Sequence, residues 1–150
     1  MIKSDKLIGY QLKSISSNQF AIIDDLYIYG ETPKLDASFA FAFEYERRII
    51  SCRAKFSFHS SKGLFMIIEG SCHFDIELGS WKEMIQDNGR LKIEKNFAAH
   101  MSSLTIGTVR GMLHAKTEQT IYNLIFIPVI NVEEFINEDV IIDPRSNPVT

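Results

Sequence analysis

The residues that most often carry out chemistry in proteins are spread thinly along this sequence. It has four histidines, and His100 and His114, if they share a helix, are about 21 Å apart by helical rise, too far to share a metal ion. It contains no glycine-rich phosphate loop and no HExxH, CxxC or GxSxG motif. We therefore expect no catalytic residue, no metal, no cofactor and no enzymatic activity.

One group of residues could imitate an acid–base site. Acidic residues and His73 alternate between Glu69 and Glu77, and Arg53 and Lys55 alternate in an earlier stretch. If these stretches are paired strands, opposite charges face one another, as is common on the solvated face of a sheet. We interpret the group as cross-strand charge pairs and not as a catalytic site.

The two cysteines, Cys52 and Cys72, are predicted to be neighbours on adjacent strands, on the apolar face. Unpaired cysteine is commonly a small buried residue. We interpret both as reduced thiols in the core, and a disulfide or redox pair is the alternative.

The elements that must position these residues follow from the period of the apolar side chains. A first strand is predicted over 7–15, and then a connection over 16–35, where Gly30 and Pro33 interrupt the pattern. Short links between the later strands indicate antiparallel hairpins. Those later strands are predicted over 36–45, 49–58 and 64–77.

Alternation also predicts the register of these strands. A turn centred between Arg47 and Arg48 would place Phe41 opposite Ala54, and one centred on Lys62 would place Cys52 opposite Cys72. Apolar residues then share one face, so we expect the phenylalanine row of 36–46, "DASFAFAFEYE", to be core. Two large apolar residues, Phe65 and Ile67, are exceptions on the polar face.

Helices are predicted in the second half of the chain. A capping box at Ser80–Glu83 indicates a short helix that ends near 87–89, and Asn96 is expected to cap a long helix over 97–116. Asn131 is expected to cap a short last helix, and the tail from Asp139 to be extended. We expect an α+β fold: a four-stranded antiparallel sheet with one long and one or two short helices on one face, in one domain over 1–150, of which 137–150 is an extended tail.

The long helix carries apolar residues on two sides. Phe97, Met101, Leu104 and Met112 are expected to lie on the sheet. A line of small residues at i, i+4 spacing runs along the same helix, although glycine inside a helix costs about 1 kcal/mol. We interpret this line as an interface with a second subunit, and a flexible or kinked helix is the alternative. Its members are Ala99, Ser103, Gly107, Gly111 and Ala115.

Composition limits the partners. The chain has 150 residues, a formal charge of −3 and a pI near 5.8, which argues against nucleic acid, because phosphate binding needs a basic surface. The N-terminus has no apolar segment typical of a signal peptide, and no window is long enough for a membrane span. We expect a cytoplasmic protein without membrane insertion.

Order and local motifs together resemble the SecB-like protein-export chaperones. The predicted order is a strand, a crossover, three antiparallel strands, a long helix, an extended return and a short helix, over about residues 7–137. Arg110 also stands at the family's spacing before the last of three matching segments. These segments are "PKLD" (Pro33–Asp36), "EGSCHFDI" (Glu69–Ile76) and "IPVINVEEFI" (Ile127–Ile136).

The resemblance implies an ATP-independent cytosolic chaperone that holds unfolded or pre-secretory polypeptides. It also implies a homo-oligomer, a dimer or a tetramer, with long helices between two eight-stranded sheets. Clients would bind apolar residues near the crossover and before the last helix. In this sequence those residues are Leu26, Tyr27, Ile28, Tyr29, Ile125, Ile127, Val129, Ile130 and Phe135.

The family contacts the motor ATPase SecA through an acidic residue and a leucine on the outer sheet face. Phe65, Ile67 and Glu69 occupy that region here, so SecA docking at these residues is expected only in an altered form. Two other functions remain open: a dedicated binder of one partner such as an antitoxin, and a small α+β protein that binds an apolar ligand between sheet and helix.

Overall fold

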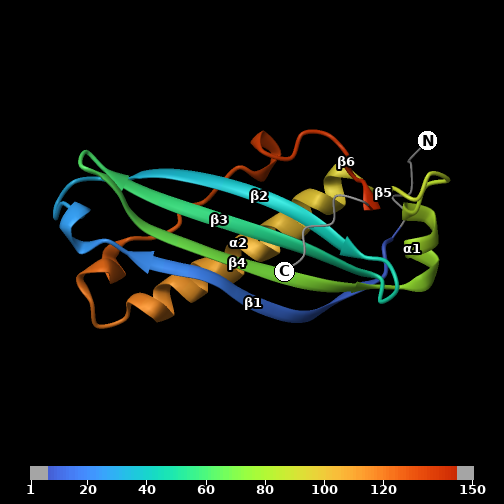
Figure 1. The fold of residues 1–150 in the computed structure, drawn as a ribbon, viewed down its shortest axis with the longest axis horizontal. Helices are drawn as coiled ribbons and strands as arrows, with labels where there is room; N and C mark the ends of the chain where they lie inside the picture. The colour runs from blue at the N-terminus through green and yellow to red at the C-terminus, as the bar shows by residue number, and fades with distance from the viewer. Residues whose placement is uncertain (1–6, 145–150) are drawn as a thin grey trace.

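The computed structural model describes residues 7–144, and within them the chain forms an α+β fold built on a four-stranded antiparallel sheet (Figure 1). The strands lie in the order β1-β4-β3-β2, so the first strand pairs with the last of the three that follow it. The predicted fold class is confirmed. The strands are β1 (Tyr10–Ile22), β2 (Lys34–Glu44), β3 (Ile49–Ser60) and β4 (Gly63–Ile76).

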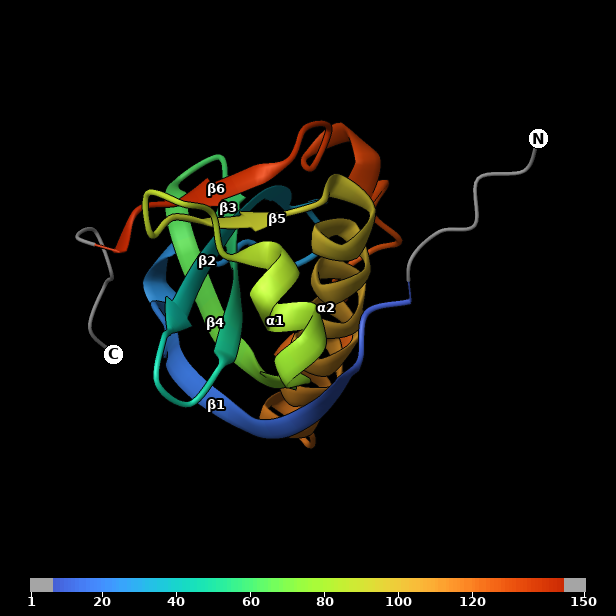
Figure 2. The same cartoon turned by 90° about the vertical axis from the view of Figure 1, so that its right-hand side faces the viewer.

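The helices lie on one side of the sheet. The long helix α2 crosses the back of the sheet diagonally, and the short helix α1 closes one end (Figures 1 and 2). A small two-stranded ribbon, absent from the sequence-based prediction, joins the segment before α2 to the extended C-terminal part. These elements are α1 (Leu78–Met84), β5 (Leu91–Ile93), α2 (Lys95–Thr117) and β6 (Val140–Ile142), with single 3-10 turns η1 (Asp24–Leu26), η2 (Ile121–Leu124) and η3 (Val132–Glu134).

The register of the sheet is as predicted between β3 and β4 but not between β2 and β3. Cys52 lies opposite Cys72, whereas Phe41 lies opposite Cys52 and not opposite Ala54. The β2–β3 loop covers 45–48 and closes with Arg48 at φ 54°, so the turn is centred one residue earlier than predicted. Because this moves each partner by two places, every side chain keeps its face, and the phenylalanine row does face the core.

The first strand is longer than predicted. It runs from Tyr10 to Ile22 and pairs with β4 from Ile76 to Met66, where a strand over 7–15 was expected. Bulges at Lys13 and Asn18 each insert one extra residue. They shift the alternation twice, which is why residues 16–22 show no regular period in the sequence.

A bulge in β4 changes the position of Phe65. The partner of His59 is Leu64 and the partner of Phe58 is Met66, so Phe65 is the extra residue between them. Its side chain is 1% exposed and its ring centroid lies 5.1 Å from that of Tyr27. The expectation that Phe65 lies on the outer face is therefore wrong.

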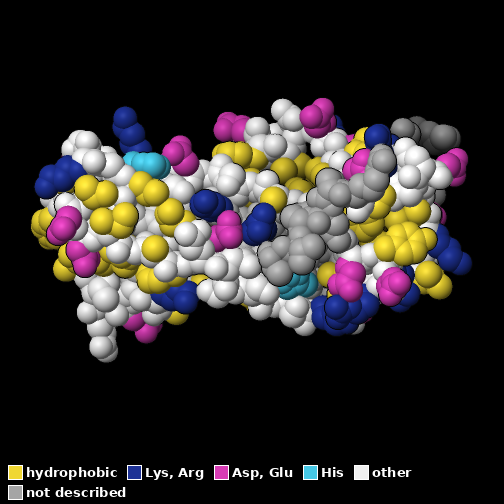
Figure 3. Space-filling model, in the orientation of Figure 1, with side chains coloured by type: hydrophobic (Ala, Val, Ile, Leu, Met, Phe, Trp, Pro, Cys, Tyr) yellow, Lys and Arg dark blue, Asp and Glu magenta, His cyan; other side chains and the backbone are white. Residues whose placement is uncertain are grey.

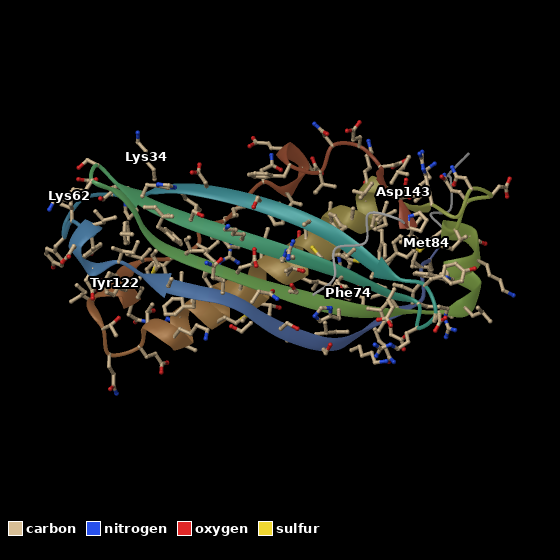
Figure 4. All side chains as sticks on the ribbon, viewed as in Figure 1. Lys34, Lys62, Phe74, Met84, Tyr122 and Asp143 are labelled. Atoms are coloured by element: carbon tan, nitrogen blue, oxygen red, sulfur yellow. The ribbon has the colours of Figure 1, made fainter. Side chains whose placement is uncertain are left out.

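Two clusters of buried side chains fill the space between the sheet and the helices. One, with Phe74 and Met84, lies at the α1 end, and the other, with Tyr122, lies at the η1 end (Figure 4). α2 places Met101, Val109 and Leu113 on the sheet, together with Phe97, as buried side chains. Leu104, expected on the sheet, is instead 42% exposed.

The helix ends differ from the predicted caps. Ser80 does not cap α1, since its Oγ accepts a hydrogen bond from the Gly9 backbone N–H at 3.0 Å, and α1 begins at Leu78. α2 begins before Asn96, and Asp139 Oδ1 accepts from the Lys95 N–H at 2.9 Å, a bond that lowers the pKa of Asp139. These partners are distant in sequence, so no local motif signals them.

The Asn131 cap is confirmed, because its Oδ1 accepts from the Glu133 N–H at 3.2 Å. The segment that it opens, η3, is one 3-10 turn, so the last helix is shorter than predicted. Within residues 7–144, no helix is long and apolar enough to cross a membrane.

Candidate polypeptide-binding surface

The crossover after β1 presents part of the predicted apolar surface. Leu26 and Tyr27 are half-buried against the core, Ile28 is half-buried, and Tyr29 is 74% exposed. The ring of Tyr27 packs between two others, 5.1 Å from Phe65 and 4.9 Å from Tyr122 between centroids. The crossover is therefore anchored by Tyr27, while Tyr29 remains available to a partner.

Tyr122 joins the crossover to the segment that follows α2. Its hydroxyl donates a hydrogen bond to Asp24 Oδ1, from the 3-10 turn η1. Burial, then the hydrogen bond and negative charge of Asp24, raise the pKa of Tyr122 to about 12. The phenol therefore stays protonated and joins η1 to η2, so the crossover and the start of the segment after α2 lie together at one end of the molecule (Figure 1).

The segment before η3 is only partly as predicted. Ile125 and Ile127 are 9% and 2% exposed and belong to the core, so neither offers a surface in the folded chain. Val129 is 96% exposed, Ile130 is half-buried, and Phe135 is 45% exposed with its ring 5.4 Å from that of Phe39.

Three exposed apolar residues in this region were missed: Ile121, Leu124 and Phe126, which are 54%, 67% and 63% exposed. Burial alternates over 124–127, since the isoleucines at 125 and 127 point inward. The sequence contains this pattern: in an extended segment, consecutive side chains point in opposite directions. If Ile125 and Ile127 face the sheet, Leu124 and Phe126 must face away from it.

Arg110 on α2 fixes the backbone of this segment. Its Nε donates to the carbonyl oxygen of Ile127 at 2.8 Å, and its Nη2 donates to that of Pro128 at 2.7 Å. Charged donors make the stronger hydrogen bonds of a protein. Phe126 and Val129 are thus held outside on a positioned main chain, which lowers the ordering cost of binding.

The line of small residues on α2 is open to the exterior. A Cβ added at Gly107 or Gly111 would meet no atom within 4 Å, apart from the helix's own nearby backbone. Ser103 and Ala115 are exposed, and Ala99 is half-buried. The residues predicted as an oligomer interface therefore form one accessible strip in the single chain.

On the other side of the sheet, Ile67 and Glu69 do lie outward and half-buried. Glu69 stands opposite Lys55, and its Oε2 lies 3.9 Å from Arg53 Nε. Cross-strand charge pairing is thus confirmed at this residue. Of the three residues predicted for partner docking, only these two are placed where a partner could touch them.

The cysteines are free and buried, as predicted. Cys52 Sγ lies 3.8 Å from Ser102 Oγ on α2, and Cys72 Sγ donates to Thr108 Oγ1 at 3.5 Å. Burial raises the pKa of Cys52 to about 11, so its reactive thiolate is scarce at neutral pH.

Comparison with known proteins gives distant structural likenesses. No protein-family model and no curated protein matches the chain. The Mycobacterium tuberculosis SecB-like chaperone Rv1957, in complex with a ChAD peptide from the Rv1956 HigA1 antitoxin, is 13% identical, with a TM-score of 0.47 over 81% of this chain and 90% of that one.

A protein of unknown function from Streptococcus agalactiae is 12% identical, with a TM-score of 0.41 over 83% of this chain and 99% of that one. Both TM-scores lie below 0.5, so the function proposed below rests on this chain's own residues.

Proposed function

We propose that this protein is an ATP-independent chaperone that holds unfolded polypeptides on the apolar side chains of the crossover and of the segment after α2. One observation carries the proposal: Leu124, Phe126 and Val129 are 67%, 63% and 96% exposed, in a segment whose backbone Arg110 fixes. Tyr29, 74% exposed, adds an aromatic group on the crossover.

The physical reason is the cost of leaving such groups in water. Burying one large apolar side chain is worth about 1.5–3 kcal/mol, so a folded chain that exposes several in one region can recover this by covering them. Apolar side chains make little demand on sequence, and contiguous exposed patches mark interaction sites. An unfolded polypeptide supplies matching apolar groups.

Assembly belongs to the same proposal. The exposed strip of small residues on α2 lets a second backbone approach closely, with Leu104 beside it as an apolar contact. Pairing of two α2 helices would bury this strip in a dimer, or in a tetramer as the resemblance to the SecB-like family implies.

The range of clients is the finer question. The chain either holds many unfolded or pre-secretory polypeptides or serves one partner, such as an antitoxin. The peptide bound to the Mycobacterium tuberculosis protein illustrates the second mode for that protein. The apolar-ligand alternative is less favoured, because two clusters of buried side chains fill the space between α2 and the sheet.

The test is an aggregation assay with a chemically denatured client diluted into buffer with and without the purified chain. We expect the wild type to slow aggregation without ATP and the Phe126→Ser, Val129→Ser double variant to lose most of this effect. Tyr45→Ser is the matched control, since Tyr45 is 60% exposed but lies in the β2–β3 loop. A wild type that neither slows aggregation nor binds the client would refute the proposal.

A further inference from the structure

The outer face of the sheet, opposite α2, contains a hollow of about 710 Å³. Its floor is low because small side chains pave the middle of all four strands, among them Ala42, Ser51, Ser71 and Ser16. Neighbouring strands are about 4.8 Å apart, so a floor crossing four strands is about 14 Å wide. Figure 3 looks onto this face, where two groups of Lys or Arg side chains flank an acidic group near the middle.

The two bulges of β1 add polar side chains to this hollow. Lys13 and Asn18 are the extra residues of the two bulges, and both line the hollow. Without the bulges, strict alternation would allow only one residue of each neighbouring pair to face outward. Bulges are common beside functional sites, where they direct a side chain.

Hydrogen bonding at the floor leaves donors unused. His73 Nδ1 lies 2.6 Å from Ser51 Oγ, and its Nε2 lies 2.8 Å from Ser16 Oγ. Burial lowers the pKa of His73 and favours the neutral ring, which has one N–H donor and one acceptor nitrogen. One serine must therefore accept from the ring, and its own hydroxyl proton is free to bind something else.

Asn18 and Arg53 also keep hydrogen-bond donors that no described residue uses. Ser71 Oγ donates to Asn18 Oδ1 at 2.6 Å, which leaves the amide N–H groups of Asn18 without a described partner. The contact of Arg53 with Glu69 is an ion pair at 3.9 Å and not a hydrogen bond, so its guanidinium also keeps donors. Hydroxyl, amide and guanidinium groups around the hollow all have hydrogen atoms to offer.

The charged side chains that line the hollow are mainly positive, which also favours an anion. Lys13, Arg47 and Arg53 line it against a single acidic residue, Glu44, whereas the whole chain has a formal charge of −3. Glu44 Oε1 is already paired with Arg47 Nε at 2.7 Å. Lys13 has no ion-pair or hydrogen-bond partner among the described residues, so its ammonium group is available.

We propose that this hollow binds a small organic oxyanion, a carboxylate or a phosphate ester, through Lys13, Arg53, Asn18 and a serine beside His73. The volume lies within the range of about 300–1,000 Å³ that small-molecule sites occupy. None of the exposed large hydrophobic side chains of the described chain lines it, whereas a protein partner would need such anchors. The site is independent of the apolar surface proposed for polypeptides.

Isothermal titration calorimetry on the full chain tests the site, with citrate as the carboxylate probe and pyrophosphate as the phosphate probe, at constant ionic strength. We expect saturable binding of at least one probe, with a Kd of about 1 mM or tighter. The stronger of the two identifies the oxyanion. Imidazole resonances of His73 should shift during the same titration.

Lys13→Gln should weaken binding about tenfold, since it removes a charged donor from an exposed position where the fold does not depend on it. Lys62→Gln makes the same charge change at the tip of the β3–β4 hairpin (Figure 4) and should leave Kd unchanged. Equal weakening by both variants, or no saturable binding of either probe, would overturn the proposal. Binding of hexaglutamate at least tenfold tighter than citrate would overturn it in favour of an acidic polypeptide.

Discussion

At the scale of single residues, Gly70 decides how closely α2 approaches the sheet. A Cβ added there would lie 2.9 Å from Val109 Cγ2 and 3.1 Å from Met112 Sδ. Gly107 lies on the side of α2 that faces away from the sheet, and a Cβ added there would meet no atom within 4 Å, apart from the helix's own nearby backbone. Two glycines that look alike in the sequence therefore have opposite roles, one in the core and one on the surface.

Gly70→Ala should lower the free energy of unfolding by about 1–3 kcal/mol, because the added methyl group overpacks the contact with Val109. Urea denaturation measures the change. Gly107→Ala makes the same change on the exposed side of α2 and is the control: in the monomer it should be neutral or stabilise by up to about 1 kcal/mol, since alanine favours the helix. A Gly70→Ala protein as stable as the wild type would mean that α2 can move away at no cost.

His73 gives the chain a predictable pH dependence. Burial lowers the pKa of His73 in the folded state below its usual value of 6.5. The unfolded chain then binds more protons below pH 6.5, so this contribution to stability is present at neutral pH and lost as the pH falls through that value. We expect the free energy of unfolding of the wild type to decrease between pH 7.5 and 5.5. The decrease should be smaller in the His73→Gln variant. A measured pKa for His73 above 6.5 would contradict the sign.

At the scale of elements, the sequence predicted the strands better than their irregularities. Alternation identified β2, β3 and β4 and, apart from the bulge at Phe65, the face of their side chains, because a buried sheet face demands a period of two. The bulges at Lys13, Asn18 and Phe65 insert single residues, and only the pairing partner on the next strand shows where they fall. The ribbon of β5 and β6 was missed because each strand has three residues.

For the predicted binding segments, too, the sequence did not show which apolar residues are buried. Exposed Tyr29 and Val129 were predicted correctly as accessible residues, but Ile125 and Ile127 are core. The composition of 121–130 indicated an apolar segment, and only the position of the sheet beneath it determines which alternate residues face inward. The caps predicted at Ser80 and Asn96 were wrong: Ser80 Oγ accepts from the Gly9 N–H instead, and Asp139 Oδ1 accepts from the Lys95 N–H at the start of α2. Both contacts join residues far apart in sequence.

Arg110→Gln tests the segment after α2 as an element. Loss of the charged donors to the carbonyl groups of Ile127 and Pro128 should free the main chain, with faster amide hydrogen exchange over 125–130 and a loss of stability of about 1–3 kcal/mol. Arg47→Gln, which removes an exposed ion pair with Glu44, should change neither. Unchanged exchange in Arg110→Gln would show that core packing of the isoleucines alone holds the segment.

At the scale of the whole molecule, the helices of the described chain cover one face of the sheet and leave the other open, and α2 has an inner and an outer side. The three proposed partners divide between the two layers: a polypeptide and a second copy on the helical layer, and a small anion on the outer face of the sheet. Occupation of one layer therefore leaves the other accessible.

Gly107→Leu should reduce the size of the assembly, because the larger side chain keeps a second helix from approaching the small-residue strip. Light scattering coupled to size exclusion measures the mass. Lys82→Leu on α1 introduces the same side chain at another exposed helical position and should leave the mass unchanged. An unaltered mass for Gly107→Leu would count against assembly through α2.

The bulges of β1 have a further consequence for a protein that would work among unfolded chains. β1 is an edge strand, and its two bulges divide it into regular runs of three and four residues: 10–12, 14–17 and 19–22. Amyloid-like stacking requires about six or seven residues in uninterrupted register. The β1 edge of the sheet is too broken to seed a fibril, so a captured chain that comes near β1 is not recruited into the sheet at this edge.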